Sequence, residues 1–137
     1  MTFAGVFATL SLMMATADTQ PLVRLDQGVL AGRADGEVAS WRNIPYAAPP
    51  AGERRWRPPG PAPTWRGQRG APSPRAICIQ PPATGAPGGG PPPMSEDCLN
   101  LNVWAPAGGG SGRAVMVWVH RGAPDKGSGT AAVDDGA

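Results

Sequence analysis

The sequence predicts an α/β protein that is built, over this length, from short β-strands and Pro/Gly-rich loops. One observation is the unbroken apolar run "VMVWV" at 115–119. Such a run is typical of a strand buried on both faces in the middle of an α/β sheet. A second observation is the 20 Gly and 18 Pro among 137 residues, and no stretch after residue 17 has an amphipathic helical period.

The composition indicates too little core material for a self-sufficient domain. Leu, Ile, Val and Phe make up 21 of 137 residues, whereas globular domains rarely fall below roughly 20%. The net charge of +2 does not indicate a nucleic-acid partner. Arg54, Arg55 and Arg57 could form a phosphate patch, but solvated charge among prolines is the favoured interpretation. The strand at 115–119 is therefore expected to belong to a larger protein.

Residues 1–17 are predicted to be a secretory signal peptide. "FAGVFATLSLMMA" is apolar but too short to span a bilayer, and "ATA" at 15–17 is a small-x-small cleavage site. The alternative is a first strand or helix of the domain, because this segment lacks Lys and Arg. The prediction implies a secreted or periplasmic protein, with a mature chain of 18–137 and no membrane span after signal removal.

Short strands are expected on both sides of a long proline-rich region. "PLVRLDQGVLAGR" at 21–33 predicts two strands around the hairpin turn Asp26-Gln27-Gly28, and "VASWRNI" at 38–44 predicts a third. From Pro45 to Pro93 the prolines are too dense for a helix or a central strand. Within that region "PPATGAPGGGPPP" at 81–93 is of low complexity and predicts a surface excursion.

Regular structure is expected to resume with two further strands. In "CLNLNVWAP" at 98–106 Leu99, Leu101 and Val103 alternate with Asn and Trp, which is the period of a strand. "AGGGSG" at 107–112 predicts a turn, and "RAVMVWVH" at 113–120 predicts a strand buried on both faces. Nothing else in the sequence could cover both faces of that strand.

The two cysteines suggest one disulfide bond. An exported chain with an even count favours a Cys78–Cys98 bridge, which would close a loop of about twenty residues and add ~3 kcal/mol. Two free buried thiols are the alternative. A zinc site is not expected, because the sequence has no further Cys and a single His, and no cofactor or other metal is expected.

Three stretches resemble the type-B carboxylesterase (cholinesterase-like) family of the α/β-hydrolases. They are "NIPYAAPPAGERRWRPPGPAPTW" at 43–65, "SEDCLNLNVWAP" at 95–106 and "VMVWVHRGAPDKGSG" at 115–129. The resemblance runs through about 21–137 in the family's order, and the Ser-Glu-Asp-Cys stretch is the most specific part. It implies an α/β-hydrolase fold, of which this chain would be the truncated N-terminal part.

The resemblance implies roles for individual residues. The backbone N–H groups of Gly122 and Ala123 would belong to an oxyanion hole, where small residues are needed because the backbone must approach a developing alkoxide. His120 would orient that loop; without the resemblance it is a polar residue at a strand end or a catalytic candidate. Two departures affect this loop. Arg121 replaces the family's first Gly, and Pro124 replaces its Phe.

The remaining implied roles are structural. Cys78 and Cys98 match the family's first disulfide, at the rim of the active-site gorge. Arg55 and Glu96 match a buried ion pair, and the alternative is two unrelated surface charges.

No catalytic residue is expected in this sequence. An ester hydrolase of this fold needs a nucleophile on a Gly-x-Ser-x-Gly elbow, followed by an acid and a His, and no such elbow occurs. The complete enzyme would cleave small carboxylic esters through an acyl-enzyme, and this chain alone would be inactive. The alternative is a small exported, disulfide-stapled binding module that derives from an esterase and lacks catalysis.

Overall fold

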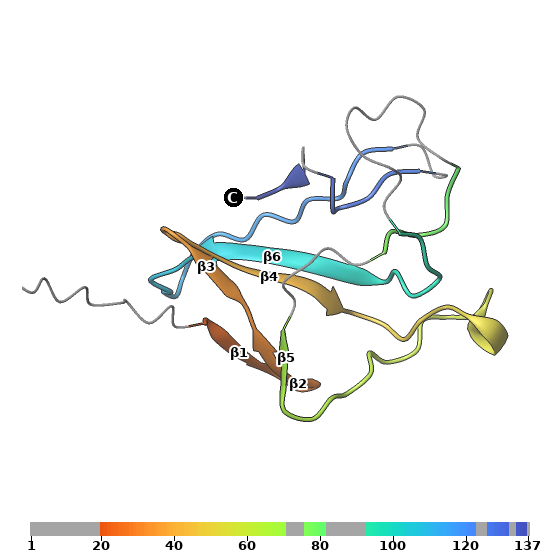
Figure 1. Ribbon diagram of the computed structural model, residues 1–137, viewed down its shortest axis with the longest axis horizontal. Coiled ribbons are helices and arrows are strands. Elements are labelled where there is room, and N and C mark those ends of the chain that lie inside the picture. The colour runs from red at the N-terminus through yellow and green to blue at the C-terminus, as the bar shows by residue number, and fades with distance from the viewer. Residues whose placement is uncertain (1–19, 71–75, 82–92, 123–125, 132–133, 137) are drawn as a thin grey trace, which may run out of the picture.

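The computed structural model describes residues 20–70, 76–81, 93–122, 126–131 and 134–136. The signal peptide predicted at 1–17 and most of the excursion predicted at 81–93 lie outside the described residues. The described strands form two three-stranded sheets that are joined by the chain between β2 and β3 (Figure 1). Both sheets contain strands that are distant in the sequence.

The first sheet has the order β1-β2-β5. β1 (Leu22–Leu25) and β2 (Gly28–Ala31) pair antiparallel around the predicted turn, which confirms the hairpin. Gly28 has φ +148°, and a Cβ there would lie 2.5 Å from the indole nitrogen of Trp65. Glycine at the end of this turn therefore allows Trp65 to lie against the hairpin, where its Nε1 donates to the carbonyl of Val29 at 3.0 Å.

The third strand of this sheet was not predicted from the sequence. β5 (Gln68–Gly70) pairs parallel with β2 and forms an edge of the sheet. It is three residues long and lies inside the proline-rich region, so it carries no readable alternation. The expectation of no central strand in this region holds for the described residues, whereas the expectation of no regular structure was wrong.

The second sheet has the order β3-β4-β6 and is entirely antiparallel. Its strands are β3 (Arg33–Asp35), β4 (Val38–Pro45) and β6 (Asn100–Pro106). β4 and β6 correspond to the strands predicted at 38–44 and 98–106. An irregularity in the pairing between Trp41 and Ile44 places Asn43 at φ +60°.

The buried core of the described residues is small. Its hydrophobic members are mostly alanines, and Leu30, at 1% exposure, is the largest fully buried side chain. The group comprises Leu30, Ala31, Ala39, Ala47, Ala48 and Ile77. Outside the sheets, the 3-10 turn η1 (Gly52–Arg54) projects away from both of them (Figure 1). The sparse core agrees with the composition of the chain.

The strand predicted at 113–120 is not formed in the structure described, whereas the exposure of the segment agrees with the expectation that nothing else in this chain covers both of its faces. The segment is in no strand, and it runs as an extended blue trace beyond β6 (Figure 1). The side chains of 115–119 are exposed at 87, 88, 83, 63 and 81%. Leu101 and Val103 of β6 are also exposed, each at 41%. An apolar run becomes a buried strand only where neighbouring strands and covering layers exist, and the described part of the chain offers none to this segment.

Candidate functional site

The predicted disulfide between Cys78 and Cys98 is present. The Cα atoms of the two residues lie 5.1 Å apart, within the range that a disulfide requires. Next to it, Ile77 and Met94 form an isolated parallel bridge, in which the N–H of Ile77 donates to the carbonyl of Pro93 at 2.9 Å. The two ends of the 81–93 excursion are thus held together both covalently and by backbone hydrogen bonds.

The Ser-Glu-Asp-Cys stretch folds as a turn that leads into β6. The hydroxyl of Ser95 accepts a hydrogen bond from the N–H of Asp97 at 3.0 Å, a local pattern typical of serine in turns. This turn also places the Glu96 carboxylate against the guanidinium of Arg55, just after η1. The two charges predicted to pair are therefore brought together. Within the described residues the pair is partly exposed, with 53% of the Arg55 side chain and 36% of the Glu96 side chain accessible.

The loop after residue 120 closes on itself through two glycines. Gly122 has φ +135°, and a Cβ there would lie 2.2 Å from the carbonyl oxygen of Lys126. Gly127 has φ +112°, and a Cβ there would lie 2.5 Å from the carbonyl oxygen of Arg121. No L side chain fits either position without a shift of the backbone. We call this close approach of 121–122 to 126–127 the loop neck.

The predicted oxyanion residues belong to this loop. Gly122 is exposed and lies in the neck, whereas Ala123 and Pro124 lie outside the described residues. Arg121 is not among the described non-glycine residues with positive φ, which are Asn43 and Trp56. The replacement of glycine by Arg121 therefore does not force an arginine into the left-handed region here.

His120 lies beside the neck and is exposed. Its Nδ1 is 3.2 Å from the carbonyl oxygen of Arg121. A Cβ on Gly127 would lie 2.7 Å from the same nitrogen. The imidazole thus packs against the second glycine of the neck, a position from which it can support the loop.

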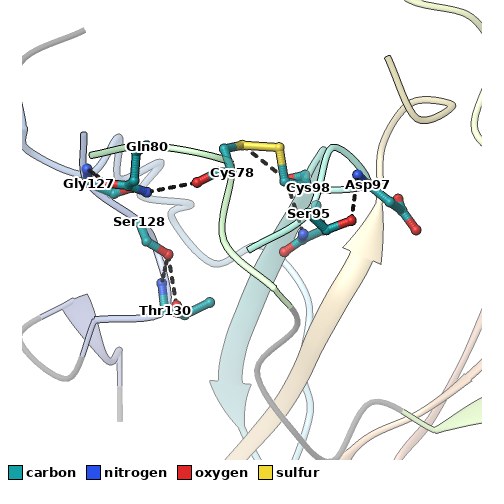
Figure 2. Close-up of a disulfide and its surroundings, with 9 residues drawn as sticks. Cys78, Gln80, Ser95, Asp97, Cys98, Gly127, Ser128 and Thr130 are labelled. Carbon is teal, nitrogen blue, oxygen red and sulfur yellow. Dashed lines mark hydrogen bonds between the residues drawn. A yellow bond between two sulfur atoms is a disulfide. The ribbon is translucent and has the colours of Figure 1, made fainter. Parts of the chain in front are cut away.

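Sequence reasoning missed the residue that joins the loop to the disulfide. Gln80 donates from Nε2 to the carbonyl of Gly127 at 3.0 Å, and its Oε1 accepts from the N–H of Gly127 at 2.7 Å (Figure 2). The same Nε2 lies 3.1 Å from the carbonyl of Cys78. A glutamine in a proline-rich loop gives no pattern that would single it out.

Asn102 of β6 forms a second attachment of the same segment. Its Nδ2 donates to the carbonyl of Gly129 at 3.1 Å, and its Oδ1 accepts from the N–H of Asn43 at the irregularity of β4. Further along, Arg42 of β4 pairs with Asp135 at 2.9 Å. The chain after the neck is thus fastened to the second sheet by polar side chains.

Two further properties of the part of the chain that the structure describes concern metal-binding groups and membrane spans. Among the residues that the structure describes, no three His, Cys, Asp or Glu side chains gather where they could hold a metal ion. Within the same ranges no helix is long and apolar enough to cross a membrane.

Comparison with known proteins identifies the family. The model of the carboxylesterase family matches residues 19–136. The chain belongs to the carboxylesterase family. A solved structure of PNB esterase is 36% identical, with a TM-score of 0.76, and the match covers 87% of this chain and 24% of that one. The predicted fold class is therefore confirmed, and the described residues are a strand-rich part of an α/β-hydrolase fold.

Two relatives named as a hydrolase and an esterase are similar over most of the chain. Phenmedipham hydrolase of Pseudarthrobacter oxydans is 39% identical over 118 residues, which cover 81% of this chain and 23% of that protein. Fumonisin B1 esterase of Sphingopyxis macrogoltabida is 38% identical over 133 residues, with 95% and 24% covered. The chain thus spans about a quarter of the length of these two relatives.

Proposed function

We propose that this chain supplies the N-terminal part of a carboxylic ester hydrolase, in which the loop after His120 carries the oxyanion hole. The observation that supports the proposal is the loop neck, where Gly122 and Gly127 leave no room for side chains. An oxyanion hole needs such a bare backbone, because its N–H donors must come within about 3 Å of the developing alkoxide.

In the proposed reaction, a serine supplied from outside this chain adds to the ester carbonyl carbon. The π electrons of the carbonyl move to oxygen, and a histidine, also from outside this chain, takes the serine proton. The N–H groups of Gly122 and Ala123 donate to the resulting oxyanion. Collapse of the intermediate expels the alcohol, which takes that proton, and water then releases the acid.

The chain by itself is proposed to be inactive towards esters. The sequence contains no Gly-x-Ser-x-Gly elbow, and its single histidine, His120, lies beside the neck. Backbone donors alone leave some acceleration over water only where a substrate pocket exists. The substrates of the complete enzyme are proposed to be small carboxylic esters, a class supported by relatives named as esterases.

The protein is also proposed to be exported, into the periplasm or the medium. The apolar segment "FAGVFATLSLMMA" followed by "ATA" supports a secretory signal. The Cys78–Cys98 bond supports the same conclusion, because structural disulfides persist in oxidising compartments. N-terminal sequencing of the secreted product tests it. A mature N-terminus at Asp18 is expected, and an intact Met1 in the cytosol would contradict export.

The function is tested with the chain and with two fusions. The first fusion continues this chain with the C-terminal part of the Bacillus subtilis para-nitrobenzyl esterase, which is 36% identical over 125 residues. The second carries Arg121→Gly and Pro124→Phe in addition. We expect no hydrolysis of nitrophenyl acetate by the chain, measurable hydrolysis by the first fusion, and a higher turnover number in the second. Hydrolysis by the bare chain, or two inactive fusions, would contradict the proposal.

A further inference from the structure

Gln80 makes a two-way contact with the backbone of the loop neck. Its amide donates to the carbonyl of Gly127 and accepts from the N–H of the same residue, at 3.0 and 2.7 Å (Figure 2). Both groups of one peptide position are thus satisfied by one planar side chain that is 47 residues away in the sequence. Two residues that face each other in an antiparallel sheet exchange the same pair of hydrogen bonds. The Gln80 amide thus takes the place of a neighbouring strand at Gly127.

Gly127, the residue that Gln80 contacts, is one of the two glycines at which the loop neck is closest. The Cα of Gly127 faces the carbonyl of Arg121 and the imidazole of His120 so closely that a Cβ would overlap both. The preceding residue, Lys126, presents its carbonyl to Gly122 at a distance that likewise admits no Cβ. The two sides of the neck lie so close that a movement of Gly127 towards Gly122 would displace that residue, and a movement away would remove its support.

Gln80 is itself anchored by the disulfide. It follows Cys78 by two residues, and its Nε2 also contacts the carbonyl of that cysteine at 3.1 Å. Cys78 is bonded to Cys98, two residues before β6 begins. The disulfide, the glutamine and the neck thus form a continuous connection from the second sheet to the loop.

We propose that Gln80 is a positioning residue for the oxyanion loop, and that it fixes the Gly122 N–H by clamping Gly127 to the Cys78–Cys98 disulfide. The assignment rests on the proposed function, because it assumes that Gly122 serves as an oxyanion donor. Catalysis by such donors depends on their being held in place before the reaction, so that no reorganisation is needed when charge develops. Gln80 itself touches neither substrate nor oxyanion in this scheme.

The first experiment measures hydrogen exchange at the Gly127 amide in the oxidised 137-residue chain, and it needs no enzymatic activity. The variants are Gln80→Ala, which removes the clamp, and Gln80→Glu, which keeps an acceptor for the Gly127 N–H but loses the donor. The matched control is Gln68→Ala, at an exposed glutamine of β5. Amides of β4 and β6 report on the rest of the fold.

We expect Gly127 to exchange roughly tenfold faster in Gln80→Ala than in the wild-type chain, the loss of about one hydrogen bond. Gln80→Glu should fall between the two, and Gln68→Ala should match the wild type. The β4 and β6 amides should not change in any variant. Three results would overturn the assignment. The first is equal exchange of the Gly127 amide in Gln80→Ala and the wild type, and the second is a wild-type Gly127 amide that exchanges as fast as in an unfolded peptide. The third is an equal acceleration of exchange throughout β4 and β6.

The second experiment places Gln80→Ala, Gln80→Glu and Gln68→Ala in the first fusion and separates kcat from KM. Donors that act only in the transition state change kcat and kcat/KM together. We therefore expect Gln80→Ala to lower kcat roughly tenfold with KM within about twofold, and Gln80→Glu to restore part of the loss. A raised KM with unchanged kcat would overturn the positioning role. An inactive parent fusion would contradict the proposed function, whereas the exchange measurement would still decide whether the clamp exists.

Discussion

The exposed run at 115–119 gives the most direct test of the structure, through the substitution Val117→Lys. Val117 is 83% exposed, and the five side chains of the run are 63–88% exposed. Burial of a side chain of this size contributes ~1.5–3 kcal/mol. The five side chains are about four-fifths exposed, so the chain lacks burial free energy on the order of 6–12 kcal/mol that full burial of these side chains would contribute. This sum is comparable to the entire stability of an ordinary domain, which is about 5–15 kcal/mol.

Two consequences follow for the isolated chain. A lysine at an exposed position should change the free energy of unfolding by no more than ~0.5 kcal/mol. A lysine at Leu30, which is 1% exposed, should cost several times more, because it would bury an unpaired ammonium. The wild-type chain should also self-associate through the exposed apolar run, and a charge in its middle should weaken that association.

Hydrogen exchange at the amides of β2 and β4 compares the wild-type chain with Val117→Lys and Leu30→Lys, because a chain with so small a core is not expected to unfold as one cooperative domain. Sedimentation velocity measures their association. We expect Val117→Lys to keep the wild-type protection of these amides, to sediment as a smaller species, and to differ clearly from Leu30→Lys. In the first fusion the same Val117→Lys should prevent folding, because the added strands and helices would bury the run. A loss of protection in the isolated chain as large as that of Leu30→Lys would refute the reasoning, because it would show that the run is already buried in this chain.

Three further predictions concern the disulfide, the ion pair and the neck. Replacing both cysteines by serine should lower the protection from hydrogen exchange of the amides in 76–81 and 93–99 by ~3 kcal/mol, because the bond closes a loop of twenty residues. Free thiols in a non-reduced peptide map of the secreted chain would contradict the bond itself. Arg55→Ala should lower the protection of the amides in 93–99 by no more than ~1 kcal/mol, because the ion pair with Glu96 is partly exposed. A loss of about 3–5 kcal/mol, as for a buried pair, would show that the pair is shielded. Gly122→Ala in the first fusion should lower kcat by roughly a hundred- to a thousand-fold, which is the effect of losing one oxyanion donor. The control Gly108→Ala should leave kcat unchanged, because Gly108 lies in an exposed turn where a Cβ would meet no atom within 4 Å.

The strands that the sequence predicted correctly are those with a local signal. The hairpin of β1 and β2 follows from a turn flanked by apolar residues, and β6 follows from the alternation of Leu101 and Val103 with polar neighbours. The Ser-Glu-Asp-Cys stretch predicted the family, which the comparisons confirm. Each of these signals lies within about ten consecutive residues, so it can be read without knowledge of the rest of the fold.

The sequence by itself determined the hairpin, the strands β4 and β6, and the family, because period and turn chemistry are properties of neighbouring residues. The tertiary structure alone decided the pairing of β5 with β2, the lack of strand pairing at 113–120 and the contact between Gln80 and Gly127. These three features join or separate residues that are distant along the chain. The apolar residues of a segment show that it can be buried, but whether it is buried depends on the neighbours that the fold brings to it. A side-chain amide likewise has no fixed partner until the fold places a peptide group beside it.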